Sequence, residues 1–472
     1  MVAWCDVAGP LSLASAYGNV LGRVLYPGWE RVRGRPTFEL LALLRHTERG
    51  SASELAALRD GLVRRLVRHA YDHTAHYRAA FDGAHVLPGD IAAVADLARL
   101  PVLDRETAQR TVDARTASWP PIAVTKATSG STGHPLLVRF SAESRHWRDA
   151  TRWRGYGWAG YHMGDKAVHL WGVAATQPTS AQRAKLAIDR VLRRDVYLDC
   201  MVRSDAALAH MVDMIRRERP NVIAGYAQAI ADLARYVERT DARTWDDIPV
   251  IYGAERLWPV DRAVIERAFG AAVFETYGCR EFMLMGMECE HHDGLHESAE
   301  NLIVELLVRD PDRGRENHWR AAQPGEHGEV AITDLHNLAN PFIRYLTGDS
   351  AVARAPRPCA CGRTLATFGP VDGRVTDTMR DADGNPVEGI LFNILFLSLA
   401  AHARHFQAVQ RSDGRVTLRV VPAQPGALAP DAEALIRAFC ATHLRGIPLD
   451  IEVVSAIPLG AAGKLRRVVV ER

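Results

Sequence analysis

The stretch Thr128-Ser129-Gly130-Ser131-Thr132-Gly133-His134-Pro135 gathers hydroxyls and glycines in one short loop. It lies between two strand-like segments, Ile122-Ala123-Val124-Thr125 and Leu136-Leu137-Val138-Arg139-Phe140. Glycines let a backbone approach an anion closely, and the hydroxyl and amide groups supply hydrogen-bond donors. The loop is not a Walker motif, because the Gly-Lys-Ser/Thr ending is missing. We interpret the segment as a phosphate-binding hairpin, with a flexible turn as the alternative.

Beyond this loop, short apolar runs alternate with helical patterns as far as about residue 350. The apolar runs are 167–171, 221–224, 249–252, 272–274 and 329–332, and helical patterns cover 206–217 and 260–269. This alternation predicts an α/β architecture in which helices cover the sheets. Ahead of the loop, the leucine spacing predicts a helical region over residues 36–118.

The last hundred residues form a separate pattern. Strand-like runs at 406–411, 416–421 and 451–454 surround a helical pattern at 430–444, which together predict a compact βαβ-like unit. A polar stretch rich in arginine and proline, residues 353–363, precedes this unit. We therefore expect two domains, residues 1–373 and 374–472, with the boundary near 374–377.

Composition excludes several classes of protein. The chain has 472 residues, is 47% hydrophobic and carries a formal net charge of +2, which gives no reason to expect nucleic acid or an anionic membrane as a partner. No apolar run reaches the length of a membrane span, and Asp6 interrupts the mildly apolar N-terminus, so we expect a cytoplasmic enzyme without a signal peptide. Seven cysteines at uneven spacing favour a reduced protein over a disulfide scaffold. Only four of the 58 basic residues are lysines: Lys126, Lys166, Lys185 and Lys464.

Further motifs follow the loop in a fixed order. They are Tyr252-Gly253-Ala254-Glu255, Thr276-Tyr277-Gly278-Cys279-Arg280-Glu281, Tyr345-Leu346-Thr347-Gly348-Asp349, Gly373-Arg374-Val375-Thr376-Asp377 and Pro458-Leu459-Gly460-Ala461-Ala462-Gly463-Lys464-Leu465-Arg466. This order and spacing resemble the adenylate-forming superfamily, and residues 69–78, 224–226 and 253–255 look most like its phenylacetate–CoA ligase branch. The resemblance covers about residues 60–472. It implies a large N-terminal domain with covered β-sheets and a small mobile C-terminal α/β lid.

The resemblance also implies a chemistry and assigns residues to it. A carboxylic acid would react with ATP and Mg²⁺ to give an acyl-adenylate, and the acyl group would then pass to CoA, a carrier-protein thiol or a free amine. Glu281 would bind Mg²⁺, a hard cation that prefers carboxylate oxygen. Lys464 would bridge the carboxylate and the α-phosphate in the transition state. The residues expected to bind ATP are Thr128, Ser129, Gly130, Ser131, Thr132, Gly133, Gly253, Ala254, Glu255, Thr276, Tyr277, Gly278, Asp349 and Arg374, with Tyr277 at the adenine, Asp349 at the ribose hydroxyls and Arg374 at the ribose and phosphate.

The substrate and the acceptor are less narrowly defined. Trp171, Tyr226 and Phe282 are compatible with a pocket for an aromatic acid, although they would equally serve as core. Residues 376–386 read as a hairpin with an Asp-Gly-Asn turn where the family has a glycine-containing hinge, which leaves CoA in doubt as the acceptor. Two alternatives remain open: transfer of AMP to a non-carboxylate oxygen nucleophile, and a nucleotide-binding regulator without activity. The chain is expected to be a monomer or a homodimer.

Four further residues have the composition of a metal site. Cys289, His296, Cys359 and Cys361 offer three thiolates and one imidazole, the set of a tetrahedral structural zinc site. The alternative is a set of buried or free cysteines with a surface histidine. His291 and His292 compete with His296 as the fourth ligand. Cys279 lies inside an active-site motif, but no base is placed beside it in sequence, which argues against a nucleophilic thiol.

Overall fold

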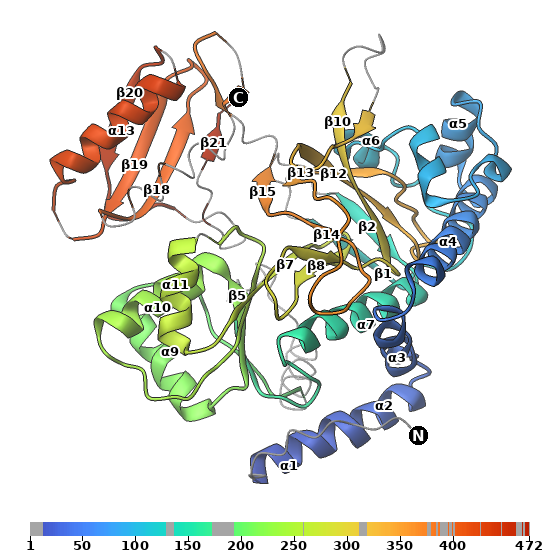
Figure 1. Ribbon diagram of the computed structural model, residues 1–472, viewed down its shortest axis with the longest axis horizontal. Coiled ribbons are helices and arrows are strands. Elements are labelled where there is room, and N and C mark those ends of the chain that lie inside the picture. The colour runs from blue at the N-terminus through green and yellow to red at the C-terminus, as the bar shows by residue number, and fades with distance from the viewer. Residues whose placement is uncertain are drawn as a thin grey trace.

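The computed structural model shows an N-terminal helical arm, a central body of sheets and helices, and a C-terminal domain lying above helices α10 and α11 in Figure 1. The residues that it describes are 13–128, 136–171, 193–257, 259–310, 319–374, 379–383, 386–387, 402–424, 426–444, 446–458 and 468–471, with Leu395, Leu399 and Leu465. Residues 129–133 of the expected phosphate loop and Lys464 therefore lie outside the described residues. Among the helices described, none is both long and apolar enough to cross a lipid bilayer.

The N-terminal region is helical, as the leucine spacing predicts, and its helices begin earlier than residue 36. The elements are α1 Leu13–Val20, η1 Leu21–Leu25, α2 Tyr26–Val32, α3 Thr37–Thr47, α4 Ala52–His73, α5 Ala75–Gly83, η2 Pro88–Asp90, η3 Val94–Arg99 and α6 Arg105–Arg110. Helix α4 begins at a capping box, in which Ser51 and Glu54 each accept a hydrogen bond from the other's backbone amide. Its inner face buries Val63, Leu66 and Val67.

The largest sheet has eight strands in the order β14-β9-β8-β7-β6-β5-β3-β4. Its strands are β3 Ala167–Leu170, β4 Asp195–Tyr197, β5 Val222–Tyr226, β6 Val250–Gly253, β7 Val273–Cys279, β8 Met283–Glu288, β9 Leu295–Glu297 and β14 Thr367–Phe368. Strands β4, β3, β5, β6 and β7 run parallel, and the remaining pairs are antiparallel. The connecting helices are α7 Ala142–Trp158, α9 Asp205–Glu218, α10 Ala227–Arg239 and α11 Pro259–Phe269. The predicted strand–helix alternation is confirmed.

A second sheet and a hairpin complete the central body. The second sheet, in the order β11-β10-β12-β13-β15, is antiparallel throughout. Its strands are β10 Leu302–Arg309, β11 Trp319–Ala321, β12 His327–Asp334, β13 Tyr345–Val352 and β15 Val371–Arg374. The expected hairpin is present as β1 Val124–Ala127 paired with β2 Leu137–Phe140. Residues of the hairpin, the large sheet and the second sheet share one apolar core that includes Phe140, Tyr277 and Tyr345.

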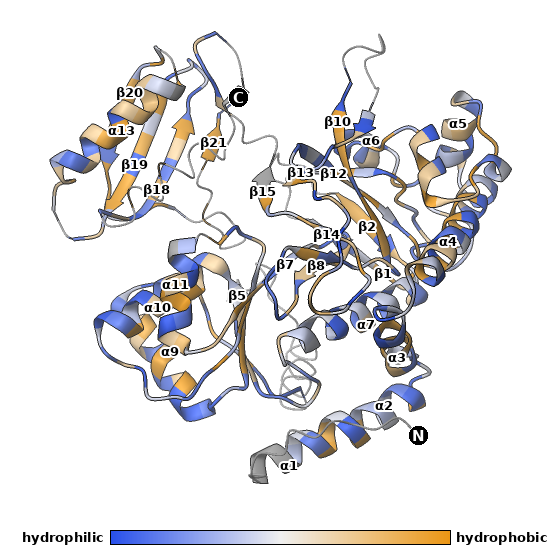
Figure 2. Ribbon diagram, viewed as in Figure 1, coloured by the Kyte–Doolittle hydropathy of each residue, from blue (hydrophilic) through white to orange (hydrophobic). Residues whose placement is uncertain are grey.

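The C-terminal domain has its own sheet, β20-β19-β18-β21, and its own core. Its elements are β18 Ala403–Gln410, β19 Val416–Pro422, α13 Pro430–His443, β20 Leu449–Val453 and β21 Val468–Val470. Figure 2 shows the apolar colour concentrated on the strands of this sheet, with hydrophilic residues on part of the exposed face of α13. Between the two domains, β16 Met379–Arg380 pairs with β17 Pro386–Val387, in agreement with the hairpin expected there.

Candidate active site

Six of the expected nucleotide-binding residues lie on strands β6 and β7 of the large sheet or directly after them: Gly253, Ala254, Glu255, Thr276, Tyr277 and Gly278. Parallel strands place their carboxyl ends together, and ligands of such sheets bind outside those ends. In adjacent strands Tyr226 pairs with Gly253, and Gly253 pairs with Thr276. A β-carbon at Gly253 would lie 2.4 Å from Thr276 Oγ1, so a side chain would not fit there. The Thr276 hydroxyl donates instead to Tyr252 O at 2.7 Å.

Asp349, expected at the ribose, is held by residues of both sheets. The Tyr277 hydroxyl donates to Asp349 Oδ2 at 2.9 Å and lies 3.3 Å from Thr347 Oγ1. The Asp349 amide donates to the same Thr347 oxygen at 3.2 Å. On the neighbouring strand, the backbone of Arg374 is paired with that of Asp349. The fold thus unites motifs that are more than 70 residues apart in the sequence.

Glu281, expected to bind Mg²⁺, lies in the turn between β7 and β8. Its residue is 6% exposed, and its Oε1 lies 3.5 Å from Arg105 Nη1. Arg105 also donates to Thr128 Oγ1 at 3.0 Å. An oxygen ligand and a hydroxyl donor therefore meet around one guanidinium, at the base of the phosphate loop.

Arg105 is a site residue that the sequence analysis missed. It is the first residue of α6, after the N-cap Asp104. In the sequence, Arg105 is recognisable only as an arginine at the start of a short helical segment. Its position in the sequence does not link it to Thr128 or Glu281. A fixed positive charge at this point is suited to a phosphate group or to holding the Glu281 carboxylate.

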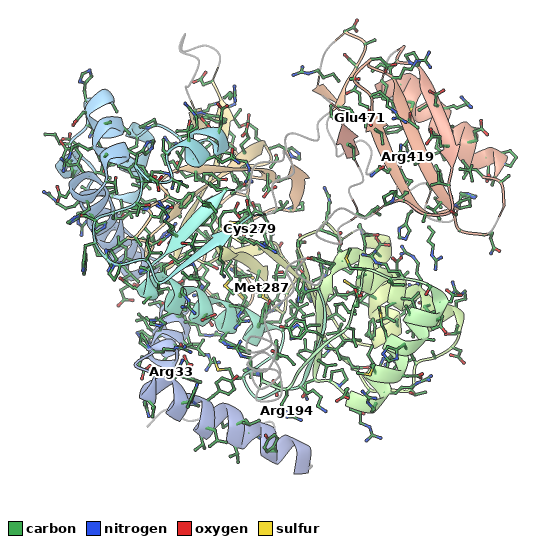
Figure 3. All side chains as sticks on the ribbon, turned by 180° about the vertical axis from the view of Figure 1, so that it is seen from behind. Arg33, Arg194, Cys279, Met287, Arg419 and Glu471 are labelled. Carbon is green, nitrogen blue, oxygen red and sulfur yellow. The ribbon has the colours of Figure 1, made fainter. Side chains whose placement is uncertain are left out.

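Cys279 lies inside this site, near the middle of the molecule in Figure 3, where Arg419 and Glu471 mark the C-terminal domain. Burial and the neighbouring Glu281 raise the pKa of the Cys279 thiol well above its ordinary value. A thiol in this environment stays protonated at neutral pH, and the thiolate is the nucleophilic form. The geometry supports the expectation that Cys279 is not a nucleophile.

Ala254 and Glu255 directly follow Gly253, the last residue of β6. Ala254 has a positive φ of 67°, a left-handed conformation that turns the chain out of the strand. The Glu255 carboxylate then accepts two backbone hydrogen bonds, from Gln228 N at 3.1 Å and from Leu465 N at 2.9 Å. Glu255 therefore joins Leu465 of the C-terminal domain to the end of β6.

The aromatic residues expected to form a substrate pocket lie in two places. Trp171 follows β3, Tyr226 ends β5, and their rings meet edge to face with centroids 5.0 Å apart. Phe282 is fully buried and packs edge to face against Phe342, with centroids 5.5 Å apart. Phe282 therefore lies in the core among aromatic neighbours, whereas Trp171 and Tyr226 stand at the same sheet edge as Gly253.

The four expected metal ligands come together. Ligand atoms of Cys289, His296, Cys359 and Cys361 all lie within 4.8 Å of one another, and all four residues are buried. Cys289 Sγ is 3.7 Å from Cys359 Sγ, and Cys361 Sγ is 3.4 Å from His296 Nε2. Zn–S bonds of about 2.3 Å in a tetrahedron place two sulfurs about 3.8 Å apart. The donor set and its spacing fit zinc.

The surroundings of His296 distinguish it from its two competitors. His296 Nδ1 is 3.0 Å from Leu365 O, so this nitrogen donates to the carbonyl and Nε2 is left to bind a metal. His292 Nδ1 is instead 3.1 Å from Glu288 Oε2. The cluster that the described residues form contains His296 and neither His291 nor His292.

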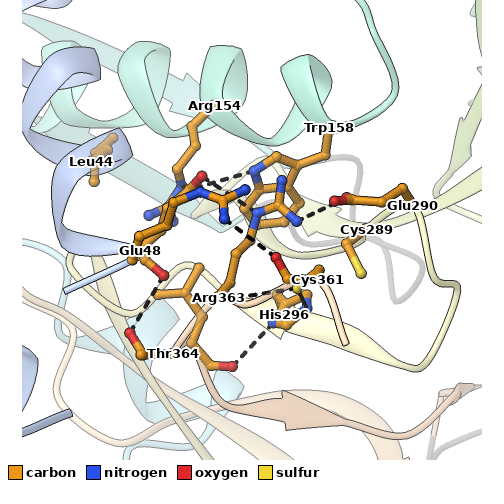
Figure 4. Close-up of polar contacts among 12 residues, drawn as sticks. Leu44, Glu48, Arg154, Trp158, Cys289, Glu290, His296, Cys361, Arg363 and Thr364 are labelled. Atoms are coloured by element: carbon orange, nitrogen blue, oxygen red, sulfur yellow. Dashed lines mark hydrogen bonds and ion pairs between the residues drawn. The ribbon is translucent and has the colours of Figure 1, made fainter. Parts of the chain in front are cut away.

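A buried ionic network surrounds the cluster (Figure 4). Arg363 donates its backbone amide to Cys361 Sγ at 3.4 Å, and its guanidinium reaches Glu290 at 2.8 Å and Glu48 at 3.4 Å. Arg154 binds both oxygens of Glu300, at 2.7 and 2.8 Å. A zinc ion bound by three thiolates would have a net negative charge, which the nearby Arg363 would offset. The network joins the cysteine loop to the ends of α3 and α7.

Comparisons with known proteins agree with this geometry. No family model matches the chain. It is 26% identical over 383 residues to a phenylacetate-coenzyme A ligase of Thermus thermophilus, covering 76% of this chain and 79% of that protein. It is 27% identical over 346 residues to a phenylacetate-coenzyme A ligase of Aromatoleum evansii, covering 70% and 73%.

Among solved structures, the fold matches that of 2-hydroxyisobutyryl-CoA ligase in its postadenylation state. The TM-score is 0.70 at 19% sequence identity, over 91% of this chain and 92% of that chain. A match over nine-tenths of both chains includes the N-terminal and the C-terminal domains. The mixed α/β fold is therefore that of adenylate-forming CoA ligases.

Proposed function

Because this chain is an AMP-forming acid ligase of the phenylacetate–CoA ligase-like branch of the adenylate-forming superfamily, we propose that its substrate is an aromatic carboxylic acid and its final acceptor is CoA. In the first half-reaction, a carboxylate oxygen attacks the α-phosphorus of ATP and pyrophosphate leaves. In the second, the CoA thiol attacks the acyl carbonyl and AMP leaves.

The observation that supports the nucleotide site is that Thr128, Glu281 and Asp349 are each held by a contact between different elements of the fold. Arg105 contacts the first two of them, and Tyr277 contacts the third. We assign Glu281 to Mg²⁺ and Asp349 to the ribose hydroxyls, because a carboxylate suits both a hard cation and a pair of hydroxyl donors. Mg²⁺ bound there would offset triphosphate charge during the attack.

The aromatic substrate is supported by the Trp171–Tyr226 pair. The backbone of Tyr226 on β5 pairs with that of Gly253 on β6, and Gly253 pairs with Thr276 on β7. The Tyr226 backbone therefore lies two strands, or roughly 10 Å, from β7. Edge-to-face rings form an apolar corner that suits a third ring. Phe282 does not belong to this corner, since it is buried in the core.

The test is pyrophosphate release with a panel of aromatic and aliphatic acids, with and without CoA. We expect release with aromatic acids, thioester only when CoA is present, and a loss of about 10²–10³ in rate for Glu281→Gln. Glu305→Gln is the control, because Glu305 is a carboxylate bound to an arginine, Arg344, away from this edge. Release with aliphatic acids alone would reject the aromatic substrate, and transfer only to an amine would reject CoA.

We propose in addition that Cys289, His296, Cys359 and Cys361 hold a structural zinc ion. The support is the buried position of all four residues and their ligand spacing. The ion would tie the β8–β9 turn to the loop that carries Cys359 and Cys361.

A further inference from the structure

Among the described residues, the C-terminal domain contacts both helix α10 and the end of strand β6. His405 Nε2, on β18, lies 3.2 Å from Asp232 Oδ1, on α10. The Leu465 amide donates to Glu255 Oε1 at 2.9 Å. The first contact joins two side chains and is an ion pair when His405 is protonated, and the second holds Leu465.

Asp232 is a fixed, ionised partner for His405. Its side chain is 3% exposed, and Arg203 Nη1 and Arg235 Nη1 lie 3.1 and 3.5 Å from its oxygens. Burial raises the pKa of Asp232, but the attraction of His405, Arg203 and Arg235 outweighs burial and holds this pKa well below its ordinary value. The two arginines belong to the N-terminal domain, so His405 is the partner that comes from the other domain.

The two contacts are linked through α10. Arg235, which contacts Asp232, is also bonded to the buried Asp261. Gln228 lies in the first turn of α10, and its side-chain Nε2 donates to Asp261 Oδ2 at 3.3 Å. The backbone amide of Gln228 donates to Glu255 Oε2. The ion pair of His405 and the amide contact of Leu465 therefore end on one connected polar network.

Release of His405 leaves no buried charge without a partner. When the C-terminal domain moves away, Asp232 keeps Arg203 and Arg235, so its desolvation stays compensated. The His405 side chain is 16% exposed and can reach solvent at the boundary. The contact thus favours one domain arrangement and still permits another.

We propose that the His405–Asp232 contact is a latch that holds the C-terminal domain in the arrangement for adenylation, in which the Leu465 amide is bonded to Glu255. This inference rests on the proposed function, and it adds that the C-terminal domain moves between the two half-reactions. His405 is a positioning residue, because it touches Asp232 and acts on the reacting atoms through the domain.

The test compares His405→Ala with His402→Ala in each half-reaction. His402 lies three residues away, and its partner at 3.5 Å is Asp431 of its own domain. We expect His405→Ala to slow single-turnover acyl-adenylate formation about tenfold, because one charged hydrogen bond is lost from the domain arrangement for adenylation. Chemically supplied acyl-adenylate should be converted with CoA at the wild-type rate. His402→Ala should change neither step, and His405→Gln, which keeps an N–H donor, should recover part of the loss.

Hydrogen–deuterium exchange supplies a readout that does not depend on the substrate. In His405→Ala the Leu465 amide should exchange faster, because its contact with Glu255 breaks more often, while β19 keeps its wild-type exchange. The latch is overturned if the Leu465 amide of His405→Ala exchanges at the wild-type rate, or if His405→Ala loses rate equally in both half-reactions. If the wild-type protein makes no acyl-adenylate from any acid, the proposed function fails, and the exchange experiment still decides the latch.

Discussion

Tyr277 shows at the scale of one residue how tertiary contacts redefine an expected role. The resemblance implies that Tyr277 stacks on or flanks the adenine. In the fold its residue is 8% exposed, and its hydroxyl donates to Asp349 Oδ2. We therefore infer that Tyr277 also sets the orientation of the carboxylate assigned to the ribose.

Tyr277→Phe should raise the KM for ATP about five- to tenfold, because it removes one hydrogen bond to a charged group and leaves the ring in place. The measurement is pyrophosphate release against ATP concentration. Tyr77→Phe is the matched control: its hydroxyl donates to Pro341 O at 3.2 Å and accepts from Ile343 N at 2.8 Å, and it does not contact Asp349, so the change should lower stability without changing KM. Equal KM values for Tyr277→Phe and the wild type would contradict the orienting role.

At the scale of elements, the four proposed zinc ligands connect segments that have little regular structure. Cys289 follows β8, His296 lies in β9, and Cys359 and Cys361 lie in the loop between β13 and β14. A structural metal adds stability where a loop buries few apolar side chains. The surrounding ion pairs of Arg154 and Arg363 extend this connection to the N-terminal helices.

Purified without chelator, the protein should contain close to one zinc ion per chain, and Cys361→Ser should lose the ion and lower Tm by on the order of 5–10 °C. Metal analysis and thermal unfolding measure the two effects. Cys200→Ser is the control for metal content, since Cys200 is a buried cysteine outside the cluster. A metal-free protein whose Tm is unchanged by Cys361→Ser would remove the zinc site.

At the scale of the whole molecule, the function depends on how the C-terminal domain meets the large sheet. Lys464 lies outside the described residues, but the adjacent Leu465 is bonded to Glu255 at the end of β6. The arrangement therefore holds Leu465 at the end of β6, beside Gly253 and Ala254 of the proposed nucleotide site. A flexible ammonium can contact two oxygens of different groups, which the rigid fork of arginine does not reproduce.

Lys464→Ala should nearly abolish acyl-adenylate formation from acid and ATP, yet still convert a supplied acyl-adenylate in the presence of CoA. Single-turnover assays of each half-reaction measure the division. Lys166→Ala is the control, because Lys166 is a lysine that is paired with Glu218, the last residue of α9. Equal loss of both half-reactions in a folded protein would show that Lys464 does not act in adenylation alone.

The element types follow from local patterns, which is why they could be predicted. The helix expected at 206–217 is α9 Asp205–Glu218, and the strand expected at 416–421 is β19 Val416–Pro422. Apolar periodicity over such lengths selects helix or strand without long-range information. The helices ahead of residue 36 were not predicted, since several large apolar side chains there, including Val24 and Trp29, stay exposed and give no inward-facing pattern.

The sequence by itself determined the α/β class, the compact C-terminal unit, the ordered motifs and the composition of the metal cluster. Each of these features depends on the apolar periodicity of a segment or on the residue types that it contains. Only the tertiary structure decided that His296 joins the three cysteines, that Phe282 belongs to the core, and that Arg105 reaches both Thr128 and Glu281. The His405–Asp232 contact likewise appears only after two domains have met. Distances between residues far apart in the chain are set by how sheets and domains pack, and no local pattern records them.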